Sequence, residues 1–141
     1  MNIDGVNNGL VLDHIKAGSS MEIYNLLGLD RLDCCVAIIK NVSSAKYGKK
    51  DIIKIDSEIE LDLDILGYID PNITVNMVKD GKLHIKRHLE LPNELRNVLR
   101  CKNPRCITTT EQEIDHLFRL VNRESKLYRC VFCEAKASGE D

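Results

Sequence analysis

Four cysteines in the C-terminal part of the chain have the spacing of a metal site. Four residues separate Cys101 from Cys106, two separate Cys130 from Cys133, and 23 lie between the two pairs. Two short loops of this kind can turn four sulfur atoms towards one point, which suits a tetrahedral zinc ion. Because cysteine fills all four positions, the spacing predicts one structural zinc ion per chain, without an open position for catalysis.

Disulfides are the alternative chemistry for these cysteines, and they require an oxidising compartment. The chain starts without the basic and apolar segments of a secretory signal. Its longest apolar run, residues 34–39, is far shorter than the roughly 20 residues that span a membrane. We therefore expect a cytoplasmic protein with reduced thiols and no membrane contact. A redox dithiol at Cys130 and Cys133 would need a βαβ context that the sequence lacks.

The other candidate ligands have simpler interpretations. Cys34 and Cys35 begin an apolar run typical of a buried strand, so we expect inert core thiols on opposite faces of that strand. His116 could compete as a zinc ligand, but four cysteines already satisfy the ion. We interpret His116 as a solvated polar residue.

Polar residues in the N-terminal part allow a second kind of chemistry. Asp13 and His14 interrupt an apolar stretch, which suits either acid–base work or a turn. Lysines from neighbouring strands could converge on a phosphate group, or could simply form a solvated face. They are Lys46, Lys49, Lys50, Lys54 and Lys86. No Walker loop, Rossmann fingerprint or kinase signature is present, so a phosphate site would depend on these side chains.

Composition divides the chain near Pro92. Residues 1–91 are rich in Ile, Leu and Val and carry a net charge of −3, whereas residues 92–141 are polar and carry +1. A polar segment of about 50 residues buries too little apolar surface to fold without a metal or disulfides. The sequence thus predicts two domains, 1–91 and 92–141.

Periodicity assigns the elements of each domain. Residues 59–69 alternate like a strand but also fit a helix, and a helix there would complete a β-α-β-β-α-β order. We predict an α+β fold: a ferredoxin-like antiparallel sheet with two helices on one face, then a small all-β, zinc-ribbon-like domain. The expected strands are 3–6, 9–15, 35–40, 51–56, 73–79, 83–85, 117–121 and 127–131, and a helix follows Ser19 and ends at Gly28.

Several segments in this order resemble one family. They are Val11–Ile15, Gly48–Ile55, Thr74–Asn76, Leu91-Pro92 and Asn97–Leu99, followed by the two cysteine pairs. Together they cover nearly the whole chain, which on this basis resembles the regulatory chain of aspartate carbamoyltransferase. The segment between Lys54 and Thr74 is shorter than in the enterobacterial members, and residues 107–115 also differ.

The resemblance implies a regulatory subunit without catalytic activity. Residues 1–91 would be the allosteric domain, and 92–141 the zinc domain that contacts the catalytic chain. The partners would be that catalytic chain, a second regulatory chain in a dimer, and CTP, UTP and ATP as effectors. Carried over by position, the nucleotide-binding residues would be Val11, Leu12, Asp13, His14, Lys54, Asn76 and Lys86. Lys49 and Lys50 match basic positions near a second nucleotide.

Two other classes of function remain open at this point. A free-standing zinc ribbon with several arginines could bind nucleic acid, but its net charge is only +1 and no set of aromatic residues for base stacking accompanies it. Four thiolates with one zinc ion would add −2, which makes the second domain about −1. An enzyme that uses Asp13 and His14 is the third class.

Overall fold

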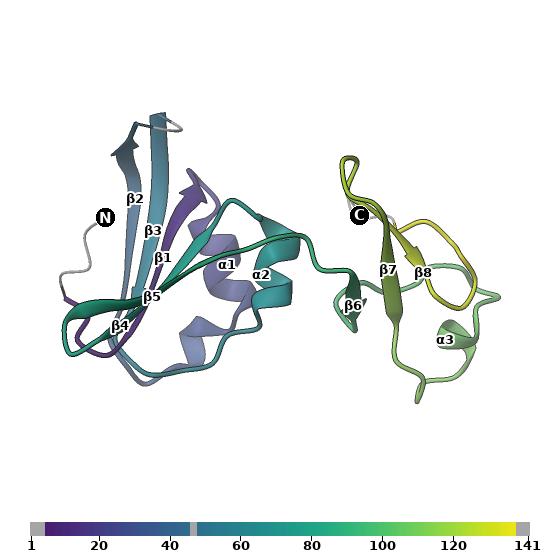
Figure 1. Cartoon of the computed structure of the whole chain (residues 1–141). Helices are drawn as coiled ribbons and strands as arrows, with labels where there is room; N and C mark the ends of the chain where they lie inside the picture. Colours follow the sequence, from purple (N-terminus) through teal and green to yellow (C-terminus); the bar gives the residue numbers. More distant parts are fainter. Residues whose placement is uncertain (1–4, 46–47, 138–141) are drawn as a thin grey trace. The chain divides into compact units, whose positions relative to one another are not determined.

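The computed structural model describes residues 5–45 and 48–137. The chain forms two compact units, Met1–Glu90 and Leu91–Asp141 (Figure 1). The strand expected at 3–6 begins outside the described residues, and Lys46 lies outside them too.

The first unit is a five-stranded antiparallel sheet with two helices. The strands lie in the order β2-β3-β1-β4-β5, and each neighbouring pair is antiparallel. Without β5, the β-α-β-β-α-β succession is the ferredoxin-like order that the sequence predicts. The elements are β1 Gly9–Lys16, α1 Ser20–Leu26, a 3-10 turn Leu29–Arg31, β2 Val36–Ser44, β3 Gly48–Ile55, α2 Leu63–Ile69, β4 Thr74–Lys79 and β5 Lys82–His88.

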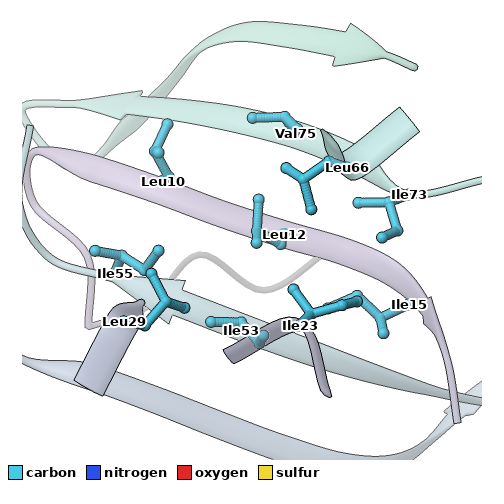
Figure 2. Packing of buried hydrophobic residues seen from close by; sticks show 10 residues of the cluster. All are labelled: Leu10, Leu12, Ile15, Ile23, Leu29, Ile53, Ile55, Leu66, Ile73 and Val75. Carbon is cyan, nitrogen blue, oxygen red and sulfur yellow. The ribbon is translucent and has the colours of Figure 1, made fainter. Parts of the chain in front are cut away.

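An aliphatic core lies between the sheet and the helices. Alternate residues of the central strands point to this side, including Leu12 of β1, Ile53 of β3 and Val75 of β4. Ile23 of α1 and Leu66 of α2 pack against them, as Figure 2 shows. Both helices therefore cover the same face of the sheet, as predicted.

The ambiguous segment 59–69 divides into two parts. Residues 59–62 are not helical, and α2 begins at Leu63. The carboxylate of Asp62 accepts hydrogen bonds from the backbone N–H groups of Asp64 and Ile65, at 3.0 and 3.2 Å, so Asp62 is a true N-cap. The helix ends at Ile69, two residues before Pro71.

The strand expected at 35–40 was wrongly predicted to be buried. β2 lies at the edge of the sheet and alternates between half-buried and exposed residues. Cys35 is exposed, and only Cys34 packs against the helix-side core. An apolar run thus indicated a strand correctly, but its position in the sheet depends on strand order, which local sequence does not encode.

The second unit is a three-stranded antiparallel sheet with one short helix. The β7–β8 hairpin matches the expected ribbon, while the structure adds β6 and one turn of helix. The Tyr128 hydroxyl donates to the carbonyl of Pro92 at 2.7 Å, and Arg123 donates to that of Leu91 at 2.8 Å. The elements are β6 Glu94–Arg96, α3 Ile107–Thr110, β7 Leu117–Asn122 and β8 Leu127–Cys130.

No helix among the described residues is both long and apolar enough to cross a membrane.

Candidate metal centre and nucleotide site

The four predicted metal ligands come together in the second unit. The sulfur atoms of Cys101, Cys106, Cys130 and Cys133 all lie within 4.8 Å of one another. The Cys101–Cys133 and Cys106–Cys130 sulfur pairs are 3.5 and 3.7 Å apart. A tetrahedron with zinc–sulfur bonds of about 2.3 Å has edges of about 3.8 Å, so the cluster fits one zinc ion. Four cysteines complete the tetrahedral coordination of a zinc ion, so zinc would have a structural role here.

Hydrogen-bond donors surround the sulfur atoms. The backbone N–H of Asn103 donates to Cys101, and that of Ala135 donates to Cys133. Burial and the neighbouring thiols raise the pKa of Cys101 to about 12. At Cys133, burial is outweighed by the Ala135 N–H and by Asn103, and the pKa falls to about 7. Burial also raises the pKa of Cys130, so deprotonation of the Cys101 and Cys130 thiols is unfavourable unless a cation balances their charge.

His116 is placed differently from the prediction. It is not a solvated residue, because its Nδ1 atom accepts the backbone N–H of Cys101 at 3.0 Å and its ring is half-buried. The backbone N–H of His116 in turn donates to the side chain of Asn97. His116 therefore holds the first cysteine loop in place without joining the sulfur cluster.

The residues predicted to bind nucleotide lie mainly on the face of the first sheet opposite its helices, here called the helix-free face. Its apolar cluster consists of Val6, Val11, Ile52 and Val78, with no contribution from the described helices. One row of residues in register crosses all five strands on this face, and its members are Ala37, Lys54, Val11, Asn76 and Lys86. The structure thus aligns four of the seven predicted residues.

Asn76 is the polar centre of this row. Its side chain is 0% exposed, and its Nδ2 donates to the carbonyl of Val11 at 3.2 Å. Its Oδ1 atom is buried and has no hydrogen-bond partner among residues 5–45 and 48–137. A buried polar atom without a partner is costly. Lys54, two strands away, is 8% exposed.

Asp13 and His14 lie at the end of the same face, where β1 has a bulge. Asp13 is 1% exposed and accepts from Lys50 Nζ at 2.9 Å and from the N–H of His14 at 2.6 Å. Burial opposes ionisation, yet these donors hold the pKa of Asp13 below its usual range. His14 has a φ of 60°, and its Nδ1 lies 3.1 Å from the Thr74 hydroxyl. The Leu12 side chain instead faces the helix-side core, so Leu12 could contribute to a site only through its backbone.

Sequence reasoning left some of this arrangement undetected. Lys50 was grouped with the lysines that could converge on a phosphate group and, by resemblance, with a second nucleotide, but its ammonium is paired with Asp13. Alternation of Lys50, Ile52 and Lys54 along β3 is the signal that places both lysines on one face. A cavity of about 820 Å³ adjoins this end of the sheet, and among its lining residues are His14, Lys16, Ser19, Lys49, Asp70 and Asn72.

The two units thus define a class of protein: a ferredoxin-like α+β domain followed by a domain with a four-cysteine metal site. Family comparison assigns both parts. The family model "aspartate carbamoyltransferase regulatory chain, allosteric domain" matches residues 1–90, and the model for that chain's metal binding domain matches residues 93–141.

Proteins that are similar to this chain over nearly its whole length indicate the same family. The aspartate carbamoyltransferase regulatory chain of Clostridium tetani is 47% identical over 135 residues, which are 95% of this chain and 94% of that protein. The one from Bifidobacterium longum is 39% identical over 137 residues, or 97% and 99% of the two chains. This chain therefore belongs to the family of aspartate carbamoyltransferase regulatory chains. It is a regulatory chain rather than a catalytic one, and that membership implies a catalytic-subunit partner.

Proposed function

We propose that residues 1–91 bind a nucleoside triphosphate on the helix-free face and that residues 92–141 contact the catalytic chain. CTP, UTP and ATP are the proposed effectors. The observation that carries the proposal is the row from Lys54 through Val11 and Asn76 to Lys86, in register across four strands. Adjacent strands are about 4.8 Å apart, so the two lysines start from backbones about 14 Å apart. That spacing lets one elongated ligand contact both ends of the row.

Charge and hydrogen bonding support this assignment. A triphosphate carries several negative charges and is recognised by cationic donors, which Lys54 and Lys86 supply. Asn76 Oδ1 is buried, so a ligand can contact it only if this face opens on binding; a ribose hydroxyl or a base amino group could then donate to it, whereas a phosphate oxygen could not. The row therefore offers cationic donors for the phosphates and one amide side chain for the ribose or the base.

The proposed regulation is a shift between two states of the assembled enzyme. A nucleotide can move the balance between a low-activity and a high-activity state only through its difference in affinity for the two. A pyrimidine and a purine that contact the same strands would favour different strand spacings. The metal domain would pass this difference to the catalytic interface.

A test of the site uses the holoenzyme and two single substitutions. Lys54→Ala removes a buried ammonium from the row, whereas Lys136→Ala removes an exposed one from the other unit. A hydrogen bond to a charged group is worth about 1.5–3 kcal/mol, so we expect Lys54→Ala to weaken CTP and ATP binding by roughly 10- to 100-fold. Titration calorimetry measures both. Unchanged isotherms for both nucleotides in Lys54→Ala would refute the site, and Lys136→Ala should match the wild type.

We also propose that two regulatory chains associate along β2. Within the described residues, β2 pairs with β3 alone, and Ile39 on this edge is 39% exposed. A long apolar edge strand invites pairing with another strand, and a second copy is the symmetric occupant. Light scattering of the full chain should report a dimer, and Ile39→Lys should shift it towards monomer. Wild-type association in Ile39→Lys would exclude this edge as the interface.

A further inference from the structure

The cysteine ligands differ in the kind of hydrogen bond they receive. Backbone N–H groups in or next to the loops 101–106 and 130–133 donate to Cys101, Cys130 and Cys133. Cys106 is instead the residue before α3, in the N-cap position, and its side chain accepts no capping hydrogen bond from the helix. Its sulfur lies 3.0 Å from the hydroxyl of Thr108, and both residues are buried.

The direction of this contact follows from the chemistry of a metal-bound cysteine. A thiolate that binds a metal has no proton, so it can only accept a hydrogen bond. The hydroxyl of Thr108 is then the donor. Thr108 is 4% exposed and belongs to a helix whose first turn begins immediately after the ligand, so its position relative to Cys106 is fixed by covalent connection and burial.

The local fold explains why this residue, and not its neighbours, faces the sulfur. The Thr109 hydroxyl donates to the carbonyls of Asn103 and Cys106, both at 2.8 Å, and so closes the turn that leads into α3. The Thr110 hydroxyl donates to the carbonyl of Ile107 at 3.3 Å on the exposed side. Of three consecutive threonines, Thr108 is thus the one that contacts a cysteine sulfur.

We propose that the Thr108 hydroxyl is a positioning group of the metal site, which stabilises the metal-bound Cys106 thiolate by donating a hydrogen bond to it. Four thiolates and one divalent ion leave a net charge of about −2 in a largely buried place. Donors around the sulfurs spread this charge, and outer hydrogen bonds of metal ligands typically contribute 10- to 100-fold to metal affinity. This proposal concerns the metal domain and does not depend on nucleotide binding.

Three variants of the full chain test the proposal. Thr108→Val keeps the shape but removes the hydroxyl, Thr108→Ser keeps the hydroxyl but removes the methyl group, and Thr110→Val is the control on the same helix. Zinc affinity is measured by competition with a chelator of known affinity. We expect the zinc dissociation constant to rise about 10- to 100-fold in Thr108→Val and to stay within twofold of wild type in the other two.

A spectroscopic readout separates a hydrogen bond from simple packing. In the cobalt-substituted chain, loss of the hydrogen bond makes the Cys106 thiolate a stronger electron donor, so the thiolate-to-cobalt band should move to longer wavelength in Thr108→Val alone. Wild-type affinity and spectrum in Thr108→Val would overturn the proposal, as would equal losses in Thr108→Ser. If Thr108→Val does not fold with saturating metal, Thr108→Ser decides: wild-type affinity supports the hydroxyl, and a tenfold loss excludes it.

Discussion

Asp13 and Lys50 form an ion pair 2.9 Å long on the helix-free face, between the central strand β1 and its neighbour β3. The side chains of Asp13 and Lys50 are 1% and 13% exposed, so each charge depends on the other for solvation. The pair joins the strand that carries Lys54 to the strand that carries Val11. It therefore links these two strands beside the proposed nucleotide row, towards the C-terminal end of β1.

Breaking this pair from one side should cost more than removing both partners. Lys50→Met leaves the Asp13 carboxylate buried and uncompensated, and we expect a loss of about 3 kcal/mol in the free energy of unfolding. The double variant Asp13→Asn, Lys50→Met should lose less than the sum of the two single variants, by about 1–3 kcal/mol. Urea unfolding of the four proteins measures the coupling. Strict additivity would show that the contact contributes nothing of its own.

Asp51 should control the acid stability of the first unit. Its buried carboxylate accepts backbone N–H groups from Gly18, Ser20 and Asn41, and these donors outweigh burial and hold the pKa of Asp51 below its usual range. A lowered folded pKa gives stability that is present above the unfolded value, about 3.9, and lost as the pH falls through the folded value.

Asp51→Asn keeps one acceptor oxygen and loses the other, so we expect it to destabilise the unit by about 1.5–3 kcal/mol at pH 7. It should also flatten the fall in stability below about pH 4. Thermal unfolding between pH 2.5 and 7 compares it with Asp30→Asn, an exposed control. A steep acid transition that survives in Asp51→Asn would assign that transition to other carboxylates.

Metal removal should unfold the second unit and release the catalytic partner. Zinc contributes roughly 10–16 kcal/mol of apparent folding free energy to small domains of this type. In Cys130→Ser we expect amide hydrogens of β7 and β8 to lose protection from exchange while those of β1 and β4 keep it. Cys35→Ser, an exposed cysteine outside the cluster, is the matched control. A Cys130→Ser chain that still assembled fully with catalytic chains would contradict a structural role for the metal.

The stability of helix α2 should depend on its N-cap residue, Asp62. Asp62→Ala removes the acceptor of two backbone N–H groups, and loss of an N-cap typically costs about 1 kcal/mol. The exposed Glu60→Ala, two residues earlier, should be neutral. Chemical denaturation measures both changes. Equal stability of the Asp62→Ala chain and the wild type would mean that packing of Leu66 alone holds the helix.

Local patterns in the sequence were enough for most elements of both units. The spacing of the cysteines was enough to predict their cluster, because two short loops strongly constrain the positions of four sulfur atoms. The cluster consists of Cys101, Cys106, Cys130 and Cys133. The dipeptide Asp80-Gly81 between β4 and β5 is typical of a hairpin turn, and both residues adopt the positive φ that such a turn requires. Where one short motif determines the geometry, sequence is sufficient.

Features that depend on distant contacts were not accessible in this way. The exposure of Cys35 follows from the edge position of β2, which is set by the pairing of β3 with β1. The contact of His116 with Cys101 joins residues 15 positions apart, across a segment that contains the short helix α3. In the same way, the row on the helix-free face required the register of four strand pairs, which periodicity within single strands does not give.

The connection at the start of the second unit has a mechanical consequence. The carbonyls of Leu91 and Pro92 accept hydrogen bonds from Arg123 and from the buried Tyr128, respectively. Tyr128 is two residues before the ligand Cys130. A displacement of the chain at residue 91 would therefore be transmitted to the β7–β8 hairpin and, through Cys130, to the sulfur cluster. The bound metal would then keep the hairpin from deforming when the chain is displaced.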